Sequence, residues 1–125
     1  MLPTRLLEAA LKKGGGLTND GTKVQRALFF LDLEVPLQYE GPRDLTGLWA
    51  DPDFRYTVMA KVGQRRIPRT RPIFRQWAIS TSAELDSTAL ELKDLVRIGI
   101  TTGLYIGIGD WRPRFGRFEF RAEVI

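Results

Sequence analysis

The chain has 125 residues, 43% of them hydrophobic and 27% charged, which is typical of one globular domain with a modest core rather than of a two-domain enzyme. It has no cysteine and no histidine, which excludes disulfides, thiol nucleophiles, Ser-His-Asp triads and the usual zinc or haem ligand sets. The net charge of +4 at pH 7 favours a negatively charged partner, and we expect no enzyme activity, metal or other cofactor.

The first part of the chain combines a short helix with one apolar segment. Apolar residues at helical spacing predict an amphipathic helix over residues 3–13, which ends at three consecutive glycines. The polar residues 17–23 predict a loop, and the apolar residues of 24–33 predict a largely buried strand. Residues 40–53 contain Gly-Pro and Asp-Pro steps and predict a long connection.

The middle of the chain predicts strands separated by a basic arm. Residues 54–62 alternate in polarity, which predicts a strand with one face for the core and a basic outer side. Residues 63–74 hold a turn and repeated arginines and prolines, so we expect a basic hairpin tip or an extended arm. The alternation returns over residues 75–83 and predicts another strand.

The last third of the chain predicts one helix and one strand. Thr88 and Glu91 have the spacing of a capping box, and the apolar face that follows predicts a helix ending between residues 99 and 103. Residues 117–124 alternate apolar with charged side chains, which predicts a terminal strand with one apolar side.

The expected order is helix, three strands, helix, strand, within one domain over residues 1–125. We therefore predict an α+β class and a ferredoxin-like, RRM-like antiparallel sheet with two helices that lacks the first strand. Three explanations of the missing strand are open: a partner chain or second copy supplies it, the sheet has rearranged, or the polypeptide is shortened. An unpaired interior edge invites strand addition, so a homo-oligomer is one expected assembly.

Charge is segregated along the chain. Residues 54–83 hold seven cations and no acid, so this segment carries +7 and, with a total of +4, the remainder carries −3. Arginine predominates, and its planar guanidinium suits phosphates and bases, which makes a polyanion the leading partner. The alternative is a solvated face whose arginines pair with scattered carboxylates. The seven cations are Arg55, Lys61, Arg65, Arg66, Arg69, Arg71 and Arg75.

A glycine-rich segment over residues 107–118 precedes the predicted terminal strand. Gly107, Gly109 and Gly116 permit positive φ and close backbone approach, which suits a phosphate backbone. Arg112 and Arg114 place cations between these glycines. The alternative is an ordinary glycine-rich turn before a strand.

Three aromatic residues near this segment are candidates for stacking on unpaired bases. They are Tyr105, Trp111 and Phe115. Each also has a core interpretation, in which the ring packs the loop against the domain. For Phe115, next to the predicted strand, we favour the core interpretation.

The glycine-rich segment resembles the carboxy-terminal glycine-rich loop of the RAMP superfamily, whose RNA-recognition-fold members form the backbone of CRISPR effector complexes. It is also similar to a group of phage and prophage proteins that end in Gly-Ile-Gly-Asp-Trp-Arg-Pro followed by Phe-Gly-Arg-Phe. Further similarity lies at the helix opening with Leu2-Pro3, at residues 24–26, and at residues 69–74 before Trp77, so it covers nearly the whole chain.

The resemblance implies binding of RNA or another single-stranded nucleic acid without catalysis. It departs from the family at the start, where relatives have a strand before the helix. The chain also has no histidine for nuclease chemistry, and Asp94 and Asp110 lack the spacing of a metal site. The predicted nucleic-acid-binding residues are Arg65, Arg66, Arg69, Arg71, Gly107, Gly109, Trp111, Arg112, Arg114 and Gly116.

Two other functions remain open. The protein could be a phage protein-interaction module, either an inhibitor of a host CRISPR defence complex or an assembly component, with the basic arm on an acidic protein surface. An RNA-cleaving enzyme would have to use Tyr56, Lys61 and Arg66 for proton transfer, which we favour least.

We expect a cytoplasmic protein, in the host cytoplasm if a phage encodes it, with no membrane partner. The sequence has no run of about 18 apolar residues that could span a bilayer. Its first residues lack the features of a secretory signal.

Overall fold

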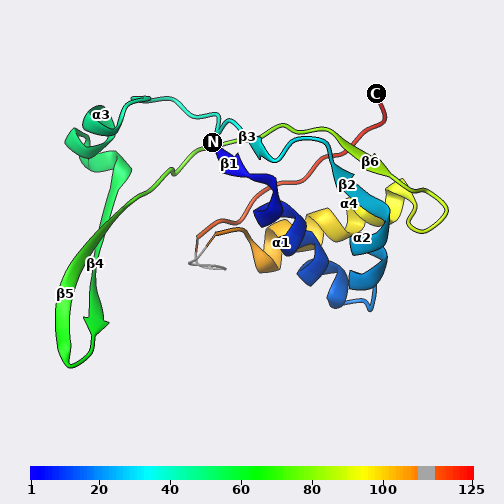
Figure 1. The fold of residues 1–125 in the computed structure, drawn as a ribbon, viewed down its shortest axis with the longest axis horizontal. Helices are drawn as coiled ribbons and strands as arrows, with labels where there is room; N and C mark the ends of the chain where they lie inside the picture. Colours follow the sequence, from blue (N-terminus) through cyan, green and yellow to red (C-terminus); the bar gives the residue numbers. More distant parts are fainter. Residues whose placement is uncertain (110–114) are drawn as a thin grey trace. The chain divides into compact units, whose positions relative to one another are not determined.

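The structure is a computed structural model that describes residues 1–109 and 115–125 (Figure 1). The described chain divides into two compact units. Unit 1 comprises Met1–Pro36 and Ser80–Ile125, and unit 2 comprises Leu37–Ile79. Each unit combines helix with short antiparallel strands, so the α+β class is confirmed at this level.

Unit 1 contains the hydrophobic core, which lies among its helices. These are α1 (Thr4–Gly16), α2 (Gly21–Ala27) and α4 (Leu92–Thr101), and α4 continues into a π-helical turn, η2 (Thr102–Ile106). Helix α1 contacts α2, α4 and η2. The buried side chains are apolar residues that recur at helical spacing, including Leu7, Ala10, Leu11, Val24, Ala27, Leu95 and Ile98.

Helix α1 runs through the three glycines at which the sequence predicted its end. The reason is close packing between elements far apart in the chain. A Cβ atom on Gly14 would lie 1.9 Å from Oγ1 of the fully buried Thr102, so only glycine lets α1 and η2 meet there. Tertiary contact therefore outweighs the low helix propensity of glycine.

The predicted buried strand over residues 24–33 is wrong over its first part. Residues up to Ala27 belong to α2, and only β2 (Leu28–Phe30) is a strand. The buried residues Val24, Ala27 and Leu28 are spaced by three and four, which is the period of a helix face. The predicted strand over 75–83 is also mostly absent, because only a bridge between Gln38 and Ala78 and the start of β6 (Ala83–Leu85) pair there.

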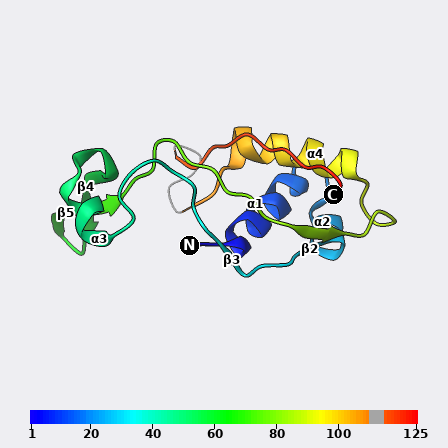
Figure 2. The same cartoon turned by 90° about the horizontal axis from the view of Figure 1, so that it is seen from above.

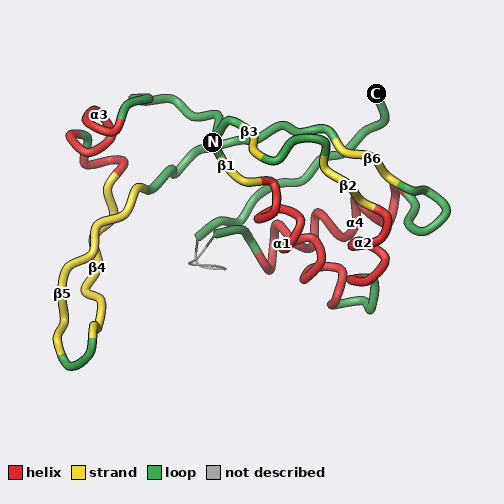
Figure 3. Tube along the Cα trace, viewed as in Figure 1, coloured by secondary structure: helices red, strands yellow, loops and turns green. Residues whose placement is uncertain are grey.

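The strands form three separate two-stranded antiparallel sheets (Figure 3). β1 (Leu2–Pro3) pairs with β3 (Glu34–Val35), and β2 pairs with β6. In unit 2, β4 (Arg55–Val62) pairs with β5 (Arg65–Pro72). The described residues do not join these pairs into one sheet, so the ferredoxin-like arrangement stays a prediction.

The helix over the last third begins later than its predicted cap. The N–H and the hydroxyl of Thr88 donate to Oδ1 of Asp86 at 3.0 and 2.6 Å, which forms a local turn. The capping box is therefore wrong, since α4 starts at Leu92 after Glu91, which makes no side-chain cap. Its last residue, Thr101, falls within the predicted range.

The predicted terminal strand is extended but belongs to no sheet. The segment lies along α4 and η2 (Figure 2). The N–H of Phe118 donates to the carbonyl of Gly103 at 3.1 Å, and the ring of Phe120 lies over Gly99. Phe118 and Phe120 are half-buried and the charged residues that alternate with them, Arg117, Glu119 and Arg121, are exposed, as the alternation predicted. A helix, rather than a neighbouring strand, covers the apolar side.

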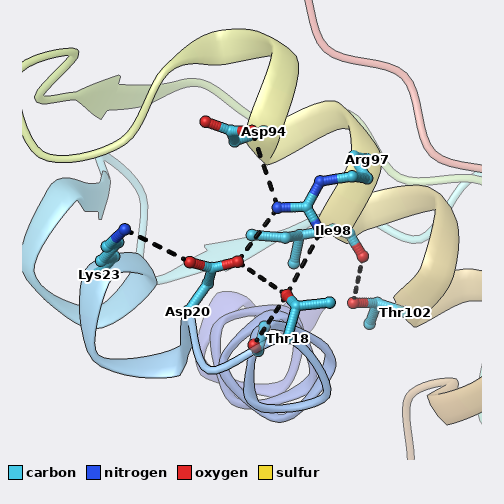
Figure 4. A network of polar contacts seen from close by, with 8 residues as sticks. Thr18, Asp20, Lys23, Asp94, Arg97, Ile98 and Thr102 are labelled. Atoms are coloured by element: carbon cyan, nitrogen blue, oxygen red, sulfur yellow. Dashed lines mark hydrogen bonds and ion pairs between the residues drawn. The ribbon is translucent and has the colours of Figure 1, made fainter.

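A polar network ties the α1–α2 loop to α4 (Figure 4). Arg97 of α4 donates to Oδ2 of Asp20 at 3.1 Å and contacts Oδ1 of Asp94 at 3.7 Å. Asp20 also accepts the hydroxyl of Thr18 at 2.7 Å and pairs with Lys23 at 3.6 Å. The hydrogen bond from Thr18, followed by that from Arg97, lowers the pKa of Asp20 below its ordinary value of 3.8.

Unit 2 holds two short helices before its strands. They are α3 (Leu45–Ala50) and the 3₁₀ turn η1 (Pro52–Phe54), within the segment predicted as a connection. The side chain of Asp44 accepts the N–H of Gly47 at 3.2 Å and so caps α3. The sequence prediction missed α3 because its six residues are too few to show a helical period.

Candidate nucleic-acid interface

β4 and β5 form a two-stranded ribbon that carries most of the predicted cations; we call it the basic ribbon. Its eight residue pairs run from Arg55 opposite Pro72 to Val62 opposite Arg65. Gly63 in the connecting turn has φ of +63°, which glycine adopts without strain. All eight residues of β5 are exposed. The basic segment is therefore an exposed hairpin strand together with its turn.

The strand register sorts the cations onto two faces, because residues directly opposite each other share a face. Arg65, Arg69 and Arg71 face the same side as their β4 partners. We call this side the arginine face. The β4 residues on it are Tyr56, Val58, Ala60 and Val62.

The opposite side is the threonine face, named for a contact between strands. The hydroxyl oxygens of Thr57 and Thr70 lie 2.7 Å apart on it. Arg66 lies opposite Lys61 on this face, near the turn. The remaining residues of the threonine face are Arg55, Met59, Pro68 and Pro72.

The predicted core face of residues 54–62 is wrong as a core. Its apolar residues share their face with three arginines of β5, and no residue of unit 2 is buried. The alternation of one strand reveals its two faces but not what the partner strand adds to each. The predicted basic outer side thus carries fewer arginines than the opposite side does.

The net charge of the protein lies in unit 2. This unit has eight cations against four acids, a net +4, whereas unit 1 has eleven of each and a net charge of zero. No acid lies within the basic ribbon. The ribbon therefore has a concentrated positive potential that attracts polyanions and weakens with added salt.

Four ribbon cations have no carboxylate partner in the part of the chain that the structure describes. They are Lys61, Arg65, Arg66 and Arg69. Arg43 and Arg75 differ, because they donate to backbone carbonyls of Leu37 and Asp53, respectively. The sequence left open that these cations pair with scattered carboxylates. For the four ribbon cations this alternative is contradicted, so their charges are available to a ligand.

An aromatic cluster holds the end of the ribbon opposite the turn. The rings of Tyr39, Phe54 and Phe74 lie with centroids 4.7 to 5.9 Å apart in tilted pairs. The N–H of Ile73 donates to the carbonyl of Phe54 at 3.0 Å and extends the strand pairing. The guanidinium of Arg43 lies 4.0 Å from the centroid of the Tyr39 ring. Arg43 therefore supports the ribbon's base rather than a ligand.

The glycine-rich bend closes on itself at its two ends. Gly107, Gly109 and Gly116 all have positive φ, which confirms that this backbone needs glycine. The N–H of Ile108 donates to the carbonyl of Gly116 at 2.9 Å, and a Cβ on Gly116 would lie 1.8 Å from the Ile108 carbonyl. Asp110, Trp111, Arg112 and Arg114 lie outside the described residues.

Two further stacking candidates can be placed. Tyr105 of η2 is 66% exposed, so its core interpretation is wrong. Phe115 is half-buried. The bend belongs to unit 1 and the basic ribbon to unit 2.

Comparisons of this chain with protein-family models, with curated proteins and with solved structures find no match. The RAMP resemblance therefore stays a prediction, and the function must be argued from the residues themselves. Among the described residues, no cluster of three or more acidic side chains is placed to hold a metal ion. No helix in the described part of the chain has the length and apolar character needed to cross a membrane.

One contact in unit 2 was missed at the level of sequence. The guanidinium of Arg55 lies 5.8 Å from the ring centroid of Trp49, an exposed residue of α3. Trp49 lies in a segment that reads as a loop, so its position beside the ribbon has no periodic signal. The nearby Asp51 and Pro52 indicated only a turn in this segment.

Proposed function

We propose that this protein binds RNA or another single-stranded nucleic acid, without catalysis, on the basic ribbon. One observation carries the proposal: Lys61, Arg65, Arg66 and Arg69 are exposed and have no carboxylate partner among the described residues, in the unit that holds all of the net charge. Phosphates are the ligand that such a row of cations neutralises best, because binding releases the counterions of the nucleic acid.

The low burial of unit 2 supports a ligand-binding role. An isolated two-stranded hairpin is marginally stable in water, and no residue of this unit is buried. A ligand that binds only the ordered ribbon stabilises it by mass action. Nucleic acid would thus both neutralise the ribbon and hold its strands together.

The fold prediction and the glycine-rich bend form a second part of the proposal. From the resemblance we infer a ferredoxin-like RAMP ancestry and a phage-type protein. The positive φ of Gly107, Gly109 and Gly116 supports a bend in which the backbone can approach a phosphate. Within this proposal, Trp111, Arg112 and Arg114 contribute to binding alongside the ribbon.

The test is fluorescence anisotropy with a labelled single-stranded RNA at several salt concentrations. The ribbon variant replaces Lys61, Arg65, Arg66 and Arg69 by alanine. The control variant replaces four exposed cations of unit 1, so both proteins lose the same charge; they are Arg5, Lys12, Lys13 and Arg26. We expect only the ribbon variant to lose binding.

Two results would overturn the proposal. One is equal binding by the ribbon and control variants, which would mean that charge alone attracts the RNA. The other is a wild-type protein that binds no nucleic acid and co-elutes with an acidic protein, which favours the protein-interaction module. Purified material can be checked first for bound nucleic acid by its absorbance at 260 relative to 280 nm.

A further inference from the structure

Trp49 is an unusually exposed aromatic residue for its type. It is 62% exposed, and no residue of its helix, α3, is buried. Tryptophan is highly buried on average because its large apolar surface is costly in water. An indole left in solvent beside a basic surface therefore points to a partner that covers it.

Local hydrogen bonds hold the backbone on both sides of Trp49, between α3 and the start of β4. Asp44 caps α3 through Gly47, and its carbonyl accepts the N–H of Leu48 at 3.1 Å. At the other end, the carbonyl of Asp51 accepts the N–H of Phe54 at 3.1 Å, which closes η1 directly before β4. The connection between Trp49 and the ribbon is therefore short and held by backbone bonds.

Arg55 links the indole to one face of the ribbon. Its guanidinium lies 5.8 Å from the Trp49 ring centroid, within the reach of a cation–π contact. Nε of Arg55 is buried and has no hydrogen-bond partner among the described residues. By strand alternation Arg55 lies on the threonine face, so Trp49 stands at the end of the face that carries Lys61 and Arg66.

The threonine face thus has the parts of a single-strand-binding surface in a line. An exposed aromatic ring stands at one end, and two hydroxyls lie in the middle. Near the turn lie two cations that have no carboxylate partner in the described part of the chain. The line from Arg55 to Lys61 spans about 20 Å of strand, at about 3.4 Å per residue. Single strands are bound elsewhere by this combination of stacked aromatics and a cationic track.

We propose that Trp49 stacks on an unpaired base while Arg55, Lys61 and Arg66 bind the phosphates of the same strand along the threonine face. This proposal rests on the proposed function and assigns it a face and a base contact. It requires a single strand, because the bases of a duplex stack on one another and leave no face open to the indole.

The test compares a ligand with bases to one without. The probes are labelled oligouridine and inorganic polyphosphate, and the variants are Trp49→Ala, Trp49→Phe and the control Leu45→Ala. Leu45 is 86% exposed on the same helix and has no aromatic ring. We expect Trp49→Ala to weaken oligouridine binding by about 5- to 150-fold, the range for one stacked base. Trp49→Phe should retain most of the affinity, and polyphosphate binding should not change.

A fluorescence measurement keeps the test independent of folding defects in the variant. In a protein with Trp77→Phe and Trp111→Phe, Trp49 is the only tryptophan. Both substitutions keep an aromatic ring, and the affinity of this protein for oligouridine is first compared with that of the wild type because Trp111 belongs to the proposed binding residues. We expect oligouridine, but not polyphosphate, to quench its emission. Unchanged emission with bound oligouridine overturns the stacking role.

Other outcomes also decide against the proposal. Equal weakening of oligouridine and polyphosphate binding by Trp49→Ala would mean that Trp49 positions Arg55 and does not stack on a base. Tighter binding of a duplex than of oligouridine would exclude the stacked base. If the wild-type protein binds neither probe, the proposed function itself fails. If it binds both, and the Trp49 variants bind them as tightly as the wild type does, the proposed function stands without the stacking residue.

Discussion

Val58 of β4 lies directly opposite Arg69 of β5, so an apolar residue and an arginine share one face of the basic ribbon. The same holds for Val62 and Arg65. This face cannot be a buried core, because a buried guanidinium without a partner is costly to desolvate. This face of the ribbon is therefore a surface rather than a core, and the part that each of the two faces has in the proposed function can be tested separately.

The first prediction concerns the two faces. Lys61→Ala with Arg66→Ala removes two charges from the threonine face, and Arg65→Ala with Arg69→Ala removes two from the arginine face. For single strands, each lost phosphate contact lowers the magnitude of the slope of log binding constant against log salt concentration by about 0.7. We expect the threonine-face pair to lower the slope by about 1.4 and the arginine-face pair to lower it less.

Binding isotherms for oligouridine at several salt concentrations measure both slopes. The melting temperatures serve as the control, and they should be equal because both pairs are exposed. A larger effect of the arginine-face pair would mean that the bound strand lies on the arginine face, which would contradict the role of Trp49.

The second prediction concerns the close contact between η2 and the C-terminal segment. A Cβ on Gly103 would lie 1.9 Å from the carbonyl oxygen of Phe118, and backbone atoms cannot rotate away. We expect Gly103→Ala to lower the free energy of unfolding by about 1–3 kcal/mol, as overpacking does. In α1, Gly16→Ala meets no atom within 4 Å and should leave stability unchanged or raise it by up to about 1 kcal/mol.

Chemical denaturation of both glycine variants measures this difference. A Gly103→Ala protein as stable as wild type would mean that the C-terminal segment does not lie on η2 in solution.

The third prediction concerns Phe120, whose half-buried ring lies over Gly99. Replacing a fully buried phenylalanine by alanine costs about 3–5 kcal/mol, so half burial predicts a loss of roughly 2 kcal/mol for Phe120→Ala. Val124→Ala is the control because Val124 is 83% exposed. Equal urea midpoints for the two variants would show that Phe120 does not pack in the core.

The fourth prediction is a pH dependence at Asp20. The hydrogen bond from Thr18, and then that from Arg97, lowers the pKa of this carboxyl below 3.8 in the folded protein. Its ionised form therefore stabilises the fold above that pH, and this stabilisation is lost as the pH falls through the lowered pKa. We expect Asp20→Asn to be less stable than wild type near neutral pH, with the difference shrinking below about pH 4.

Thermal unfolding at several pH values gives this comparison. Glu8→Gln, which removes an exposed carboxyl from α1, is the control and should show no such convergence. A difference between Asp20→Asn and wild type that stays constant down to about pH 3 would contradict the charge-based mechanism.

The fifth prediction concerns local stability. Because no residue of unit 2 is buried, backbone amides of β4 and β5 should exchange with solvent at least about a hundredfold faster than those of α1 and α4. Phe74→Ala removes two ring contacts from the aromatic cluster and should accelerate ribbon exchange further, whereas Leu45→Ala should not.

Hydrogen–deuterium exchange measures these rates with and without oligouridine. Protection of the ribbon by oligouridine is the expected result. Slow exchange of the free ribbon would show that another element covers it.

Several features of this protein follow from the sequence by local physics. The absence of acids over residues 54–83 concentrates the charge wherever the segment lies. Gly107, Gly109 and Gly116 adopt the positive φ that their residue type permits. The end of α4 at Thr101 and the alternating exposure around Phe118 and Phe120 also depend on nearest neighbours in the chain.

Other features depend on contacts that the sequence does not reveal. Gly14 and Gly15 lie within α1 because Thr102 and Val24, distant in the chain, pack against them. The terminal segment pairs with no strand, because α4 and η2 already cover its apolar side. The arginines of β5 share their faces with particular residues of β4 because the turn at Gly63 sets the register. Periodicity gives each element its own faces, but only the packed structure decides which other residues share or cover them.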